Sequence, residues 1–286
     1  MDQRIINLFD EYTHAPLSRQ EFLSRLAKLA GSTAAALALL PLLEVNYAKA
    51  EVVPADDPDL KIEEIEYTGD GSKVKGYLAQ PSSKGKKGAV VVIHENRGLN
   101  LHIKDIARRV AKAGYIALAP DALSPLGGTP ANEDEARKLI GELDAQKNLN
   151  NYLKGLEYLR SYKNANGKTG ALGFCWGGGL VNQLAVHDPR LNAGSSFYGR
   201  QPDAADVSKI KARLQLHYGG LDERINAGIP AYEEALKKAG VSYELFVYEG
   251  ARHAFNNDTA PARYNEAAAK LAWERTLALF KDTLAS

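Results

Sequence analysis

The chain has one cysteine, Cys175, and it lies in the segment Gly-Phe-Cys-Trp-Gly at residues 173–177. This is the cysteine form of the G-x-S-x-G elbow, in which a sharp turn between a strand and a helix exposes a nucleophile. The glycines are needed because side chains would clash in so tight a turn. A helix N-terminus also favours a thiolate through the helix dipole. The pattern predicts that Cys175 is a nucleophile, and the alternative is a buried, unreactive cysteine.

Two further residues follow in the order that an elbow enzyme requires, which is nucleophile, acid and histidine. Asp222 comes just after a predicted strand at 214–218, and His253 comes just after one at 242–248. Because parallel strands bring their carboxyl ends to one edge of a sheet, the three side chains are expected to meet there. His253 would accept the thiol proton and protonate the leaving group, while Asp222 would hold its tautomer.

The segment His-Glu-Asn-Arg-Gly at residues 94–98 follows the first long apolar strand. An elbow enzyme takes one oxyanion donor from this loop and the other from the residue after the nucleophile, so the N–H groups of Asn96 and Trp176 are candidates. Glu95 would lie near the thiol, or would be a surface carboxylate paired with Arg97. No H-E-x-x-H pattern occurs and one cysteine cannot form a multi-thiolate site, so no metal is expected.

Segments that alternate in polarity, and short β-branched runs, predict the elements that position these residues. Strands are expected at 61–67, 73–79, 89–93, 115–119, 170–174, 193–198, 214–218 and 242–248. Helices are expected at 105–113, at 133–161 in one or two pieces, from 178 onward, at 229–239 and at 262–284. This alternation predicts an α/β fold with a mostly parallel central sheet and helices on both of its faces.

Residues 1–53 are predicted to form an N-terminal helical extension, and residues 54–286 to form the main domain. The acidic, proline-rich segment at 54–58 marks the boundary between them. A capping box at 18–21 predicts that a helix of the extension begins there.

The extension also has features of an export signal. Residues 18–23 resemble a twin-arginine signal in which Gln20 replaces the second arginine, an apolar run covers 30–43, and Ala-Lys-Ala at 48–50 is typical of a cleavage site. The run has about 14 residues, fewer than the ~20 of a spanning helix, so no stable membrane insertion is expected. We predict a packed extension of a cytoplasmic protein, with a cleaved signal and periplasmic export as the alternative.

Length and charge limit the function further. A chain of 286 residues can bury a large core in one or two domains. Its formal net charge is +1 and it has no long basic run, whereas nucleic-acid binding leaves a basic footprint. The partner is therefore expected to be a small molecule rather than a nucleic acid.

Together these motifs resemble the dienelactone hydrolase family, a branch of the α/β-hydrolases with a cysteine nucleophile, over about residues 60–284. The resemblance implies an α/β-hydrolase fold and hydrolysis of esters or lactones through a thioester on Cys175, without a cofactor, by a monomer or homodimer. It gives Glu95 the role of pairing with the resting thiol and activating it when substrate enters. It also places Tyr198, within Phe-Tyr-Gly at 197–199, beside the substrate.

One departure from the family concerns substrate binding. The family carries a substrate-binding arginine four residues after the histidine, where this chain has Asn257, which is itself a candidate substrate-binding residue. Arg97, Arg137 and Arg200 are candidates to replace its charge, or are surface arginines.

Two other functions remain open from the sequence. The chain could be a non-catalytic binding module on a hydrolase scaffold, although three triad residues in order argue against that. It could also be a thiol-dependent acyl transferase. A dithiol redox cycle within one chain is excluded, because a single cysteine has no resolving partner.

Overall fold

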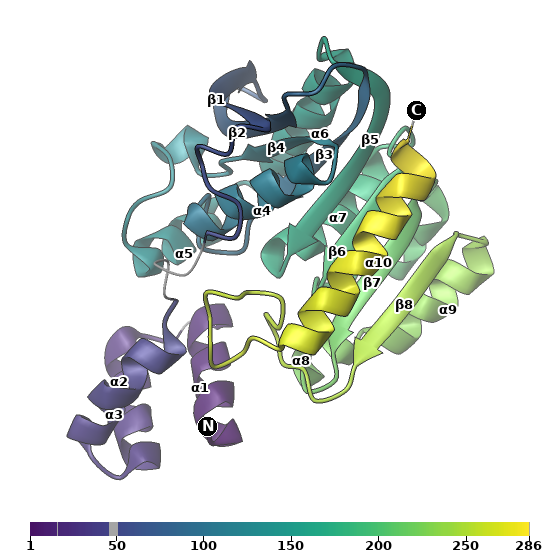
Figure 1. The fold of residues 1–286 in the computed structure, drawn as a ribbon. Helices are drawn as coiled ribbons and strands as arrows, with labels where there is room; N and C mark the ends of the chain where they lie inside the picture. The colour runs from purple at the N-terminus through teal and green to yellow at the C-terminus, as the bar shows by residue number, and fades with distance from the viewer. Residues whose placement is uncertain (16, 46–50, 286) are drawn as a thin grey trace.

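The computed structural model describes residues 1–15, 17–45 and 51–285, and its core is an eight-stranded mixed sheet (Figure 1). The strands are β1 (Leu60–Thr68), β2 (Lys73–Pro81), β3 (Lys87–Ile93), β4 (Ile116–Pro120), β5 (Ala165–Phe174), β6 (Ala193–Phe197), β7 (Arg213–Gly219) and β8 (Tyr243–Tyr248). Their order across the sheet is β1-β2-β4-β3-β5-β6-β7-β8. β2 pairs antiparallel with β1 and with β4, and the other pairs are parallel.

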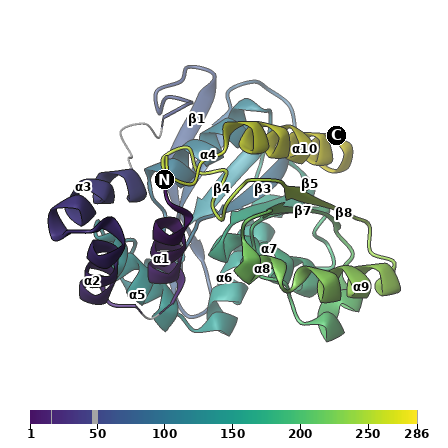
Figure 2. The same cartoon turned by 90° about the horizontal axis from the view of Figure 1, so that it is seen from below.

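Helices cover both faces of this sheet, as Figure 2 shows. α4 (Leu101–Lys112) and α10 (Glu266–Leu284) pack on one face, while α6 (Ala145–Ser161), α7 (Trp176–His187) and α9 (Ile229–Ala239) pack on the other. Strand β3 shows the alternation that this requires, because Val90 and Val92 belong to the apolar cluster under α4 and α10, whereas Val91 belongs to the cluster under α6, α7 and α9. The shorter helices are η2 (Ser124–Leu126), α5 (Glu133–Glu142), η3 (Ala204–Lys209) and α8 (Glu223–Asn226).

The predicted α/β fold is confirmed, and the boundary errors have local causes. α4 begins at Leu101 rather than 105 because Asn100 caps it, its side chain accepting from the N–H of Ile103. The stretch 133–161 forms two helices, since Asp144 caps the second. The last helix begins at Glu266 and not at 262, because residues 261–263 form a turn and Asn265 caps the helix.

Three helices form the N-terminal extension: α1 (Gln3–His14), α2 (Arg19–Ala30) and α3 (Thr33–Leu43), which are purple in Figure 1. The predicted cap of α2 is present, with the hydroxyl of Ser18 3.2 Å from the N–H of Glu21. The three helices bury an apolar cluster of their own, made of Ile5, Leu8, Phe9, Tyr12, Phe22, Leu26, Ala36, Leu40 and Leu43. Ala262 of the main domain packs against it.

The structure adds one helix to the predicted extension and leaves the predicted cleavage site untested. Helix α1 was not predicted, although Ile5, Leu8, Phe9 and Tyr12 have helical spacing. The Ala-Lys-Ala segment at 48–50 lies outside the described residues. Within the described residues, no single helix is long and apolar enough to cross a membrane; α2 and α3 meet that test only together, and they are bent by 110° at their junction.

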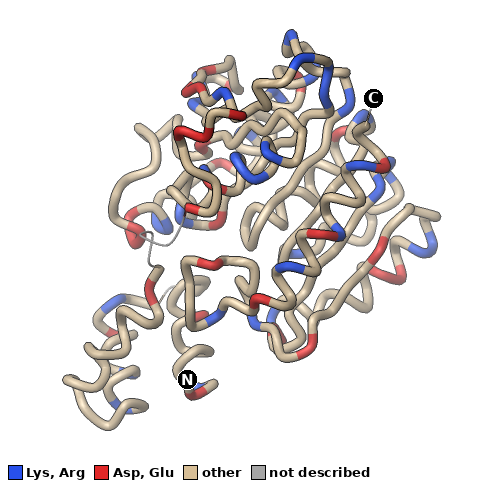
Figure 3. Tube along the Cα trace, viewed as in Figure 1, with Lys and Arg blue, Asp and Glu red and all other residues tan. Residues whose placement is uncertain are grey.

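Charged residues are spread over the whole trace, as Figure 3 shows. Acidic and basic side chains occur in both the extension and the main domain, and many are paired, such as Lys104 with Glu64 at 2.7 Å. No extended stretch of one sign is evident in the part of the chain that the structure describes.

Candidate active site

Cys175 is the single residue between the end of β5 and the start of α7. Its backbone has φ 55° and ψ −114°, a conformation that L-residues rarely adopt. Its N–H donates to the carbonyl of Phe197 at 3.0 Å, which ties the turn to the end of β6. Strain of this kind costs of order 1–3 kcal/mol and persists only where the surroundings enforce it. The sharp turn that the G-x-C-x-G pattern predicts is therefore present.

The glycines of the motif are required by close approach of neighbouring backbone. A Cβ on Gly173 would overlap the carbonyl of Gly177. A Cβ on Gly177 would lie 2.5 Å from the carbonyl oxygen of His94 and 2.6 Å from that of Ile93. Both atoms belong to the end of β3 and the loop after it, so the elbow is packed directly against the loop that carries Asn96.

Gly177→Ala is expected to lower the free energy of unfolding by about 1–3 kcal/mol, as overpacking of rigid neighbours does. Urea unfolding followed by tryptophan fluorescence measures this change. Gly141→Ala in α5 is the matched control, because a Cβ there meets nothing within 4 Å. The control is expected to be as stable as the wild type or more so, since alanine is the better helix former. A Gly177→Ala protein with wild-type stability would contradict the packing described here.

Asp222 and His253 meet at the same edge of the sheet as the cysteine. The Nδ1–H of His253 donates to Oδ2 of Asp222 at 2.5 Å, and both side chains are buried. Asp222 is held in turn by the N–H of Ile225 at 3.3 Å, at the start of α8. This arrangement fixes the tautomer of His253 and leaves its Nε2 buried without a hydrogen bond. Burial alone would lower the pKa of His253, but the Cys175 thiolate, Asp10 and the bond to Asp222 raise it to about 10.

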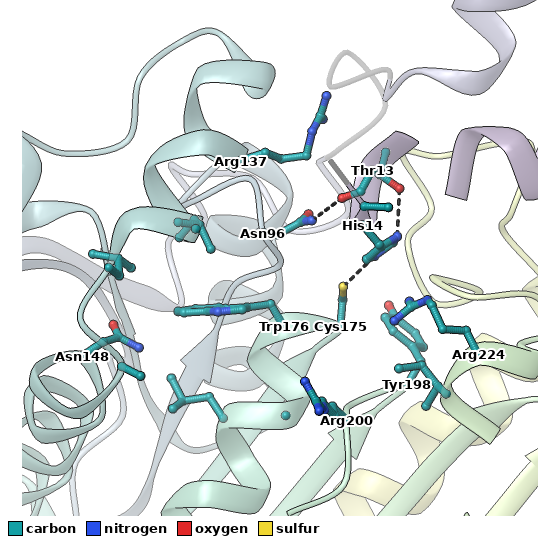
Figure 4. A pocket seen from close by; sticks show the side chains of 18 of the residues that line it. Thr13, His14, Asn96, Arg137, Asn148, Cys175, Trp176, Tyr198, Arg200 and Arg224 are labelled. Atoms are coloured by element: carbon teal, nitrogen blue, oxygen red, sulfur yellow. Dashed lines mark hydrogen bonds between the residues drawn. The ribbon is translucent and has the colours of Figure 1, made fainter. Parts of the chain in front are cut away.

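The group in contact with the sulfur is His14, at the end of α1 (Figure 4). Its Nε2 lies 3.2 Å from Sγ of Cys175, and its ring meets that of His253 edge to face at 4.6 Å. Burial raises the pKa of the thiol, but positive charge on His14 and His253 lowers it to about 6. His253 lies close enough to the sulfur to lower its pKa, but its Nε2 makes no hydrogen bond of good geometry to a described residue. This lowered pKa favours the thiolate form of Cys175 beside the two imidazole rings.

Among the described residues, His14, Cys175 and His253 also form the one group that could hold a metal ion. One ligand atom from each lies within 4.8 Å of the other two. Two imidazole nitrogens and a thiolate are ligands that Zn²⁺ accepts. A metal held there would occupy the sulfur of Cys175, so metal binding and nucleophilic attack by this sulfur would exclude one another.

Glu95 is buried beside the site, but its hydrogen-bond partner is not the thiol. Its Oε2 accepts from Nδ2 of Asn257 at 2.9 Å. Burial raises the pKa of Glu95, and the positive charges of Arg97, His102 and Arg263 outweigh this and hold it below its usual range. The expectation of a resting thiol paired with Glu95 is therefore replaced by a thiol paired with His14. Asn257 positions Glu95 and is not among the residues that line the cavity.

A cavity of about 1340 Å³ opens above Cys175. Asn96 and Trp176, the expected oxyanion donors, both line it, as does Tyr198. Trp176 is the first residue of α7, where an N–H has no helical acceptor. Its indole stacks on the ring of His94 at 5.2 Å and 12°, which fixes the orientation of the side chain. The cavity can therefore admit a small substrate to the sulfur and to these N–H groups.

The candidate substrate-binding arginines differ in whether they line the cavity and whether they form an ion pair. Arg97 is buried with an ion pair to Glu133 at 3.3 Å, and it does not line the cavity. Arg137 lines the cavity but is paired with Asp134. Arg200 and Arg224 line the cavity, are exposed, and have no ion pair among the described residues. Figure 4 shows these two on the side of Tyr198, near Cys175.

Comparison with known proteins shows which family and fold the chain resembles. The sequence model of the dienelactone hydrolase family matches residues 74–284. Two curated relatives are described as "Putative carboxymethylenebutenolidase": one from Saccharolobus solfataricus is 37% identical over 74% of this chain and 95% of its own, and one from Methylorubrum extorquens is 30% identical over 93% of this chain and 95% of its own. The second alignment must include part of residues 1–53. The crystal structure of a "Putative Dienelactone Hydrolase" from Klebsiella pneumoniae subsp. pneumoniae has a TM-score of 0.71 and 27% identity, and covers 77% of this chain and 98% of that one.

Proposed function

Because this chain belongs to the dienelactone hydrolase family and is thus a hydrolase, we propose that it cleaves carboxylic esters or lactones through a thioester on Cys175. The observation that carries the proposal is the elbow cysteine, buried beside a histidine that is bonded to Asp222 at 2.5 Å. A thiolate, an imidazolium and an orienting carboxylate are the parts that covalent acyl transfer requires.

In the first half of the reaction the thiolate of Cys175 attacks the carbonyl carbon. The negative charge moves to the carbonyl oxygen, where the N–H groups of Asn96 and Trp176 stabilise it. The carbon–oxygen bond to the leaving group then breaks, and Nε2–H of His253 gives its proton to the departing alkoxide. In a lactone the alcohol stays tethered to the acyl group.

In the second half a water molecule gives a proton to Nε2 of His253 and adds to the thioester carbonyl. The carbon–sulfur bond breaks, which releases the acid and regenerates the thiolate and the imidazolium. Asp222 stays ionised throughout and stabilises the charged ring. No redox partner or cofactor enters this balance.

Replacing Cys175 by serine tests whether the thiolate itself is needed. The hydroxyl fits the same space, but it is not ionised near neutral pH, so turnover of an activated phenyl ester is expected to fall by about tenfold or more. The kcat of both proteins on one ester measures the effect. Full activity of the Cys175→Ser protein would show that Asp222 and His253 activate an alcohol equally well, and the proposed role of the thiolate would be wrong.

Two arginines that line the cavity predict a preference of the enzyme for anionic substrates. Arg200 and Arg224 place exposed positive charge on the wall of the cavity that Cys175 also lines, so we expect esters or lactones that carry a carboxylate to bind better than neutral ones. Arg200→Gln is expected to raise KM for an anionic ester by about two- to fivefold, the value of an exposed ion pair. KM for a neutral ester of the same acyl group serves as the control. An equal change for both esters would contradict a role in charge recognition.

A further inference from the structure

The N-terminal extension places one of its side chains, His14, against the sulfur of Cys175. Helix α1 is fixed against the main domain next to the site: Nδ2 of Asn96 donates to the carbonyl of Thr13 at 2.7 Å, and the hydroxyl of Tyr12 donates to Asp134. These contacts come from two different segments of the main domain. The position of His14 over Cys175 is thus set by the packing of the whole helix.

The hydrogen bonds of the His14 ring determine what its Nε2 can do. Nδ1 lies 2.8 Å from the backbone carbonyl of Asp10, and a carbonyl oxygen only accepts, so Nδ1 carries a proton. Nε2 can then either accept from the thiol or, when protonated, donate to the thiolate. In both states a single proton lies between His14 and the sulfur, which is the geometry of a thiolate–imidazolium pair.

The half-buried carboxylate of Asp10 supports the charged form of this pair. Oδ1 of Asp10 lies 3.4 Å from Nδ1 of His14 and 3.9 Å from the guanidinium of Arg263. Burial raises the pKa of Asp10, but the charges of His253, His14 and Arg263 outweigh it and keep the pKa low. Asp10 thus places negative charge near His14 as Asp222 does near His253, although only Asp222 is hydrogen-bonded to its histidine through the side chain.

We propose that His14 is a second catalytic histidine, which holds the Cys175 thiolate between turnovers and leaves Nε2 of His253 free for the substrate. The proposal rests on the proposed function, since it assigns the thiolate a partner for the same reaction. His14 keeps its proton while the carbon–sulfur bond forms, and it binds the sulfur again when that bond breaks. His253 alone exchanges a proton with the leaving group and with water, so the balance of the reaction is unchanged.

This division of labour explains two observations together. Nε2 of His253 is buried without a hydrogen bond, which a histidine that both held the sulfur and waited for substrate would not show. His14 is held by the extension and lies 3.2 Å from the sulfur, which a merely structural histidine would not need. The other ionisable groups near the sulfur, Tyr198 and Arg263, act on it through space and make no hydrogen bond to it among the described contacts.

Alkylation of Cys175 tests this role without any ester. The chain has one cysteine, so intact-mass spectrometry after iodoacetamide treatment reports its reactivity at each pH. The wild type is expected to label with an inflection near the thiol pKa of about 6. His14→Gln and His14→Ala remove the positive partner, which raises a neighbouring thiol pKa by roughly one unit or more, so labelling at pH 6 should fall about fivefold or more. Free imidazole should restore labelling of His14→Ala toward the wild-type rate.

His187→Gln is the matched control: His187 also lines the cavity, but it is exposed at the end of α7 and, among the described residues, its ring bonds to the carbonyl of Gln183 and not to the sulfur. Its labelling profile is expected to match the wild type. A wild-type profile in both His14 variants would overturn the proposal, and so would a slow His14→Ala protein that imidazole fails to rescue. Alanine suits the last turn of a helix, so the variants are expected to fold. Failure of the proposed function is seen separately, as ester turnover that survives loss of Cys175.

Discussion

Cys175→Ala is expected to abolish ester hydrolysis, with a loss of about 10⁴-fold or more in kcat, because removal of a nucleophile removes the covalent route altogether. The other groups at the bottom of the cavity, His14, His253 and Tyr198, could polarise water only weakly in its place. The measurement is turnover of an activated phenyl ester by equal amounts of the two proteins.

The fold is expected to survive this change. Cys175 carries a small side chain, and alanine retains its Cβ, so the cavity left behind is small and the contacts of the elbow glycines are kept. Urea unfolding should show a free energy within about 1.5 kcal/mol of the wild type. A folded Cys175→Ala protein that hydrolyses the ester at the wild-type rate would contradict the proposed function.

His253→Ala is expected to cost about 10³-fold or more in kcat/KM, and more than Asp222→Asn, because the histidine moves the proton whereas the aspartate orients it and stabilises its charge. The bond of 2.5 Å between them makes the two residues one unit. The double variant is therefore expected to lose little more than His253→Ala alone.

The kcat/KM values of the two single variants and the double variant form a cycle that tests this coupling. Arg25→Ala is a control outside the site, since Arg25 pairs with Glu11 at 2.7 Å on the surface of the extension. It is expected to keep wild-type activity. Losses that simply multiply in the double variant would mean that Asp222 or His253 has been assigned the wrong role.

The elbow and its partners could be predicted from sequence because each depends on short-range constraints. Gly173 and Gly177 are required by backbone atoms that a Cβ would strike, so they mark the turn at Cys175. Asp222 and His253 directly follow strands, and the parallel sheet brings those strand ends together. The strand pattern was therefore sufficient to predict most of the fold and the meeting of Cys175, Asp222 and His253 at one edge of the sheet.

The surroundings of the thiol could not be predicted in the same way, since they depend on contacts between distant segments. Glu95 is bound by Asn257, and its charge is balanced in part by Arg263, a residue that was expected inside a helix but lies in a turn. His14 comes from a helix whose amphipathic spacing was present in the sequence but whose docking site was not. No local pattern connects residue 14 with residue 175.

The most direct test of the account is capture of the acyl-enzyme. Wild type is mixed with an activated ester, quenched in acid during turnover, and examined by intact-mass spectrometry. We expect the mass of one acyl group on the wild type, its loss on treatment with neutral hydroxylamine as for a thioester, and no added mass on Cys175→Ala. A wild type that turns over ester without ever carrying the acyl group, or a Cys175→Ala protein that carries it, would contradict the thioester on Cys175.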